Sequence, residues 1–293
     1  MLDALSDPLN HPEFLPGLLA GAGALVAGVI LAARQQPSPA AAGPLLLVSV
    51  LAGLAWTGQA TWVLLAGLGL LAVAAVLVRR LRVTAAVMAI AGIALLTEGL
   101  GPGLSVWRLL VVAGGLALAR ALTTFDGSSP HAGSAPLLVL LTAGGIYATV
   151  PDTEAARVLL AASLPLAALA WTSGMRLGRG GALVLGGLLT WVIATGGVGR
   201  DGSVVGALAA AGLLLADPAA RAVAGGSVLD GLKAGRTRTL VVLGALQLAL
   251  SLTASRIAGL EETALAAGVV AGPLLLGTIA VLALGWRALR LRG

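Results

Sequence analysis

Five charged side chains form the strongest candidate for a polar site in this chain: Glu98, Arg108, Asp152, Glu154 and Arg157. They flank apolar segments whose ends the charge pattern assigns to one side of a membrane. Glu154 and Arg157 are three residues apart and can pair on one helix, and acids near a helix start favour its dipole. Capping and surface pairing account for this group. The alternative is an outer vestibule that binds a polar headgroup, a sugar or a peptide.

Gln247 and Ser251 are a second candidate, because they lie four residues apart in the middle of an apolar segment. A buried amide in lipid needs partners, and interhelical hydrogen bonds of this kind contribute about 0.6 kcal/mol on average. The pattern favours a contact that joins helices. A contact to a substrate is the alternative.

Two prolines and several glycine pairs also interrupt the apolar segments. Pro165 and Pro273 lie near segment centres, where each removes a backbone donor and predicts a kink. Such kinks are either ordinary features of membrane helices or the breaks of discontinuous helices around a site. The Gly17/Gly21 spacing is typical of close helix packing in lipid.

Residues for most enzyme chemistry are missing. The chain has no cysteine, which excludes disulfides and thiolate chemistry, and its two histidines, His11 and His131, are too far apart for a metal-site spacing. No phosphate-binding loop or nucleophile elbow occurs. No Asp, Glu or His lies at the centre of an apolar segment, which counts against a proton-coupled carrier. The sequence therefore predicts no cofactor and no metal, and gives no support for catalysis.

The composition predicts a membrane protein. Hydrophobic residues make up 58% of the 293 positions and charged residues only 10%, whereas a soluble domain carries about 25% charged residues. Arginine supplies the basic charge almost alone, since Lys233 is the single lysine, and this composition indicates a high-GC bacterial genome. The basic residues cap apolar segments and are not interleaved with aromatic residues. We therefore expect anionic lipid headgroups, and not nucleic acid, as the partner of the net charge of +6.

Eleven apolar segments are long enough to be candidate spans. They cover approximately 15–33, 40–56, 60–78, 83–99, 104–121, 135–150, 154–172, 181–198, 203–220, 239–256 and 263–285. The ninth is the weakest, because Asp217-Pro218 has the pattern of a helix N-cap followed by a first-turn proline.

The charges between these segments alternate. With the N-terminus outside, the inner segments hold fourteen Lys/Arg and three Asp/Glu, and the outer segments hold four Lys/Arg and nine Asp/Glu. The basic excess on one side indicates the cytoplasmic face. An odd number of spans preserves this separation and leaves the chain ends in different compartments.

Arginines near the ends of the apolar segments have a topological role. Arg108 and Arg120 lie in one predicted span, about 18 Å apart along a helix, so one or both must snorkel to the interface, pair, or face a wet interior. The cluster Arg79, Arg80 and Arg82 lies just inside the membrane and is expected to contact anionic lipid.

The sequence thus predicts an all-α fold: one integral membrane domain over 1–293, a polytopic bundle of about eleven transmembrane helices. Residues 1–14 would form a short external segment, 217–238 a cytoplasmic interfacial segment, and the C-terminus would be cytoplasmic. The predicted location is the bacterial plasma membrane. The predicted function is a permease or facilitator, or an accessory envelope component, with possible membrane-protein partners. The alternatives are a non-catalytic scaffold subunit and a membrane-embedded transferase acting at the outer face.

Overall fold

The described part of the chain is entirely helical, without a strand. The structure, a computed structural model, describes residues 14–33, 42–78, 80–98, 106–128, 134–150, 153–196, 207, 210–212 and 236–258. The helices with defined bounds in these residues are α2 (Phe14–Ala33), α3 (Ala42–Trp56), α4 (Trp62–Leu77), α5 (Arg82–Leu96), α6 (Val106–Ser128), α7 (Ser134–Thr149), α8 (Glu154–Ser173), α9 (Gly178–Gly196) and α13 (Arg236–Ala258). The predicted all-α class is confirmed for these residues.

The helices follow the predicted apolar segments closely. The first eight segments correspond to α2 through α9 and the tenth to α13, with ends that differ by a few residues. The main difference is α6, which continues to Ser128 and not only to residue 121, so that Asp126 belongs to a helix and not to a loop. Most of segment 203–220, all of 263–285, and the terminal segment 1–13 lie outside the described residues, as does Pro273.

Two of the described helices, α8 and α9, are both long and apolar enough to cross a membrane by length and composition. The other described apolar stretches are shorter, between 10 and 17 residues. A helix needs about 20 residues to cross the hydrocarbon core. The helix lengths therefore support membrane crossing for two helices, and the predicted count of eleven spans is not confirmed.

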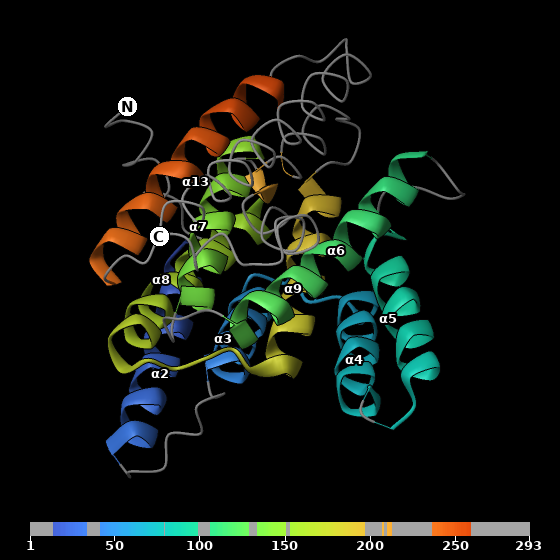
Figure 1. The fold of residues 1–293 in the computed structure, drawn as a ribbon, viewed down its shortest axis with the longest axis horizontal. Coiled ribbons are helices and arrows are strands. Elements are labelled where there is room, and N and C mark those ends of the chain that lie inside the picture. The colour runs from blue at the N-terminus through green and yellow to red at the C-terminus, as the bar shows by residue number, and fades with distance from the viewer. Residues whose placement is uncertain are drawn as a thin grey trace, which may run out of the picture.

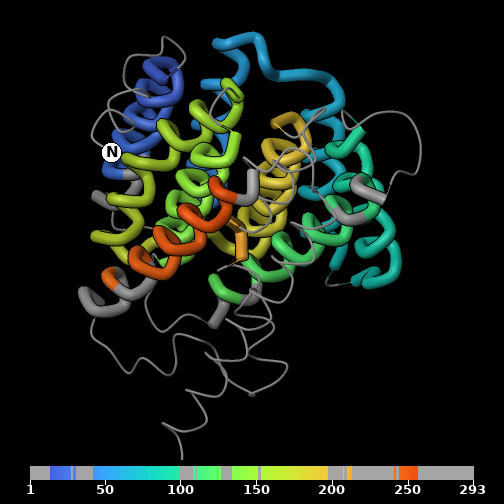
Figure 2. The backbone as a smooth tube through the Cα atoms, turned by 90° about the horizontal axis from the view of Figure 1, so that it is seen from above, coloured from blue at the N-terminus to red at the C-terminus, as the bar shows by residue number. Residues whose placement is uncertain are grey.

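Helix α9 forms the centre of the bundle. It packs against α3, α4, α5, α6 and α8, and Figures 1 and 2 show it between the α4–α5 pair and the side formed by α2 and α8. Glycines allow these close approaches. A Cβ built on Gly186 would lie 2.4 Å from Cα of Ala119 on α6, and one on Gly181 would lie 2.6 Å from Cα of Gly43 on α3. Close packing of backbones is how helices associate in lipid.

The Gly17/Gly21 pair packs α2 against α8. A Cβ on Gly17 would lie 2.9 Å from the carbonyl oxygen of Val158, and one on Gly21 would lie 2.9 Å from that of Ala162. Helix α8 continues through Pro165, whose ring lies against Gly21. Gly21 and Pro165 therefore contribute to the same helix contact.

Candidate functional site

A pocket with a volume of about 250 Å³ opens where α4 and α6 end and α5 and α9 begin. Ten of its fourteen lining residues are apolar, three are arginines and one is a threonine. They are Leu71, Ala74, Ala75, Val78, Arg82, Ala85, Ala86, Ala89, Leu116, Ala119, Arg120, Thr123, Arg179 and Leu183. The lining contains no acidic residue, so the pocket combines an apolar wall with a net charge of +3.

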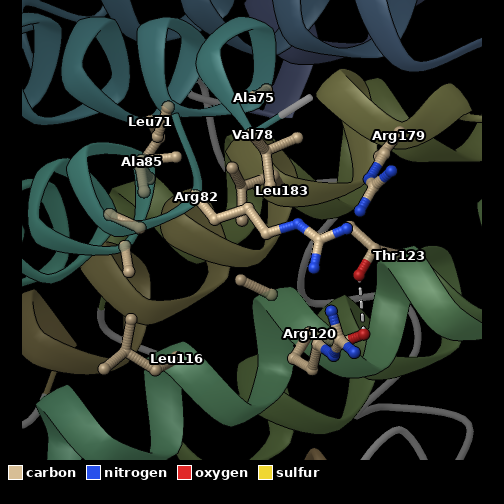
Figure 3. A pocket seen from close by; sticks show the side chains of 14 residues that line it. Leu71, Ala75, Val78, Arg82, Ala85, Leu116, Arg120, Thr123, Arg179 and Leu183 are labelled. Atoms are coloured by element: carbon tan, nitrogen blue, oxygen red, sulfur yellow. Dashed lines mark hydrogen bonds between the residues drawn. The ribbon is translucent and has the colours of Figure 1, made fainter. Parts of the chain in front are cut away.

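The three arginines reach this pocket from three helices. Arg82 is the first residue of α5, Arg120 lies in the C-terminal half of α6, and Arg179 is in the first turn of α9. Figure 3 shows their guanidinium groups directed toward the same part of the pocket, beside Thr123. All three arginines are exposed, and Thr123 donates a hydrogen bond to the carbonyl oxygen of Arg120 at 2.7 Å. A ligand entering the pocket can therefore meet several guanidinium donors together.

Two of these arginines are placed where helix electrostatics disfavours them. The N-terminus of a helix carries partial positive charge, so a basic residue in the first turn is unfavourable. Neither α5 nor α9 has an acid in its first turn, and the N-cap residue of α5, Leu81, makes no side-chain capping bond. Helix N-termini with unsatisfied N–H groups are ready anion sites. The N-terminus of α5 and the arginines thus favour the same ligand charge.

Asp126 ties α6 to the start of α9 beside this pocket. Its carboxylate oxygens accept hydrogen bonds from the backbone N–H groups of Leu177 and Gly178, both at 2.9 Å. Nη1 of Arg176 donates to the Asp126 carbonyl oxygen, also at 2.9 Å. Burial raises the pKa of Asp126, although the two backbone hydrogen bonds and the charge of Arg176 act in the opposite direction. Asp126 follows the predicted span and positions the helix that carries Arg179.

Of the predicted outer group, Arg108 lies on α6, Glu154 and Arg157 both lie on α8, and Glu98 follows the end of α5. Arg108 on α6 donates to the carbonyl oxygen of Ala94 near the end of α5 at 3.2 Å. Glu154 at the start of α8 accepts a hydrogen bond from Nε2 of Gln59 at 2.6 Å. Glu98 is exposed.

Arg157 and Asp152 complete this group. Arg157 on α8 is buried, with 8% of its surface exposed, and it makes polar contacts. Asp152 lies outside the described residues. The predicted vestibule stays a prediction, and the observed contacts join Arg108 of α6 to α5 and Glu154 of α8 to the turn between α3 and α4.

Gln247 and Ser251 lie in a helix contact. Gln247 is 2% exposed, and its Nε2 donates to the carbonyl oxygen of Ala210 at 2.6 Å. Ser251 donates to the Gln247 carbonyl oxygen at 2.8 Å. A Cβ on Gly145 of α7 would lie 2.8 Å from Nε2 of Gln247, so the amide packs directly on that glycine. These contacts are those expected of a residue that joins helices.

The amide oxygen of Gln247 has no hydrogen-bond partner among the described residues. Gln247→Met keeps the side-chain length and removes both the Ala210 hydrogen bond and this unpaired acceptor. Because an intramembrane hydrogen bond contributes about 0.6 kcal/mol, we expect the free energy of unfolding to change by less than about 1 kcal/mol. Thermal unfolding in detergent would measure it. A loss several times larger would mean that the amide has a further essential partner.

The sequence patterns did not predict the pocket, although they indicated other roles for Arg82 and Arg120. Arg82, Arg120 and Arg179 each lie within about two residues of the inner end of a predicted span. Their common position at the inner ends of predicted spans was the feature of the sequence that could have indicated a shared site. Which arginines share a pocket depends on which helices are neighbours, and sequence spacing does not give that.

Comparison of this chain with protein-family models, curated proteins and solved structures finds no match. Within the residues that the structure describes, no group of His, Cys, Asp and Glu could hold a metal ion. The class of protein that fold and site define is thus an all-helical bundle with an arginine-lined, apolar-walled pocket.

Proposed function

We propose that this chain is a multi-spanning protein of the bacterial plasma membrane that binds an anionic amphiphile at its cytoplasmic side, as a transport-type or accessory component. One observation carries the proposal. Arginines that the charge pattern assigns to three different inner segments line one pocket. The residues predicted to be outer, Glu98 and Arg108, lie at the other ends of α5 and α6. One orientation in the membrane is therefore consistent with the charged residues at both ends of α5 and α6.

The surface of the bundle supports a lipid environment. Large apolar side chains are exposed along α2, α4, α5 and α13, among them Ile30, Val76, Val87 and Leu252 at 50%, 75%, 60% and 60%. Soluble monomers rarely expose extended apolar patches, whereas a lipid-facing surface requires them. Trp56 and Trp62, at 66% and 86% exposed, flank the α3–α4 turn, where aromatic rings are typical of the headgroup zone.

A scaffold role is the second candidate, because one observation favours it. Gln247, the most buried polar candidate for a substrate contact, is packed against Gly145 and bonded to Ala210. A protein whose intramembrane polar groups all join helices would hold partners and not pass a solute. The open arginine pocket is what favours ligand handling over this role.

The two ends of α5 provide the test of sidedness. The chain has no native cysteine, so single cysteines can be introduced without background labelling. Arg80 precedes α5 and Glu98 follows it, and both are exposed. In intact bacterial cells we expect a membrane-impermeant maleimide to label Glu98→Cys, and to label Arg80→Cys only after permeabilisation.

Both variants should be labelled equally once the protein is denatured, which controls for expression. Labelling of both residues from the same side would contradict the proposed orientation of α5. Recovery of the protein in the soluble fraction would contradict the membrane location altogether.

A further inference from the structure

The arginine pocket has the composition of an amphiphile site with a defined place for charge. Its polar end consists of Arg82, Arg120, Arg179 and Thr123, and the rest of its wall consists of alanine, leucine and valine. A fully polar anion would leave that wall unused. An apolar ligand would make no use of the guanidinium groups. The lining therefore fits a ligand with an anionic head and an apolar body.

The number and type of donors indicate the chemistry of the head. Guanidinium groups donate paired N–H bonds that match phosphate oxygens, and phosphate offers more acceptor atoms than a carboxylate. Three arginines from three helices can approach a tetrahedral group from different directions (Figure 3). The N-terminus of α5, which has no side-chain cap, adds backbone donors of the kind that bind phosphate.

The size and position of the pocket indicate which source of phosphate fits. A volume of about 250 Å³ is smaller than the roughly 300–1,000 Å³ of pockets that enclose a whole drug-sized ligand. It can hold a headgroup and the start of a chain. The exposed Val83 and Val87, at 79% and 60%, follow the lining residues Arg82 and Ala86 along α5 and offer apolar surface for the remaining chain.

We propose that this pocket is a specific site for one phosphate-bearing lipid, with Arg82, Arg120 and Arg179 binding the phosphate and the alanine-rich wall contacting the glycerol and upper acyl chain. This assignment rests on the proposed function, since it takes the pocket to lie at the cytoplasmic membrane surface. It differs from general attraction of lipid to a basic face. The specific site requires these three arginines and binds one lipid per protein chain.

The test measures lipid binding to the purified full-length protein in mild detergent. Native mass spectrometry with added phosphatidic acid should show one retained lipid per chain. The triple variant Arg82→Gln, Arg120→Gln, Arg179→Gln should bind at least about tenfold more weakly, because even one charge-assisted hydrogen bond corresponds to about that factor. The matched control is Arg80→Gln, which removes an exposed arginine two residues from Arg82 that does not line the pocket.

The control should retain the affinity of the unaltered protein. Equal losses in Arg80→Gln and the triple variant would show diffuse attraction to basic charge and overturn the specific site. A triple variant that is poorly folded would be replaced by the three single variants, each expected to weaken binding. Unchanged affinity in all three would overturn the proposal.

Two further ligands distinguish a lipid phosphate from a soluble phosphate. Diacylglycerol, which lacks the phosphate, should not be retained, and retention as strong as that of phosphatidic acid would overturn the role of the arginines. Inorganic phosphate at millimolar concentration should not displace the lipid. Displacement would assign the pocket to a soluble phosphate and overturn the lipid assignment. Binding in detergent does not depend on the orientation of α5, so this result is separate from the maleimide test of the proposed function.

Discussion

Gly186→Ala is expected to lower the free energy of unfolding by about 3 kcal/mol or more, because overpacking a tight contact costs about 1–3 kcal/mol even where side chains can adjust. Here the added Cβ would meet the backbone of α6, at 2.4 Å from Cα and 2.7 Å from N of Ala119. Backbone atoms cannot rotate away, so α6 and α9 must separate. Thermal unfolding in detergent, followed by tryptophan fluorescence, would measure the loss.

Gly69→Ala is the matched control. Gly69 lies in α4, and a Cβ built on it meets nothing within 4 Å. Replacing an exposed helical glycine by alanine typically stabilises by about 0.5–1 kcal/mol. The two variants thus make the same chemical change with opposite expected signs. Equal unfolding temperatures for both would show that α6 and α9 are not packed as described.

Asp126→Ala is expected to cost about 2–5 kcal/mol, since it leaves the N–H groups of Leu177 and Gly178 without their acceptor, and a buried unsatisfied donor costs about 1–3 kcal/mol. Asp126→Asn keeps one acceptor oxygen and should cost less. The measurement is again thermal unfolding in detergent. Loss of this link should also release the start of α9, so phosphatidic acid binding should weaken although Asp126 does not line the pocket.

The pH dependence of stability provides an independent check on Asp126. Its pKa is raised, mainly by burial, so the folded state holds the proton more tightly than the unfolded state does. Stability from this group is therefore greatest below the ordinary pKa of an aspartate, about 3.9, and falls as pH rises through the raised value. Asp126→Asn should lack this fall, so the difference between it and the unaltered protein should change across that window and stay constant above it. Parallel profiles for the two proteins would contradict a raised pKa.

Arginine placement links the stability predictions to the pocket. Arg82 and Arg179 begin their helices at positions that the helix dipole disfavours. A bound anion would offset that electrostatic cost. At the start of α9 the carboxylate of Asp126 has the same effect, because it accepts hydrogen bonds from the two backbone N–H groups that precede Arg179. The fold thus stabilises α9 with an internal anion and leaves α5 without a side-chain cap.

Local patterns determined the helices of this protein. Runs of apolar residues bounded by arginine, glycine and proline predicted α2 through α9 and α13 to within a few residues, because the length and polarity of a segment are local properties. The end of α6 was predicted too early. Asp126 is a poor helix former on its own, and it is accommodated in that helix by hydrogen bonds to Leu177 and Gly178, about fifty positions away.

The candidate site depended on tertiary structure. The sequence placed Arg82, Arg120 and Arg179 near the inner ends of predicted spans, and it favoured a helix contact for Gln247, with a substrate contact as the alternative. The packing of α4, α5, α6 and α9 brought the three arginines to one pocket, and Gly145 and Ala210 enclosed Gln247. Choice of neighbours and rotation about each helix axis decide these outcomes. Both depend on how small residues on several helices pack against one another, and this information is not contained in any single segment.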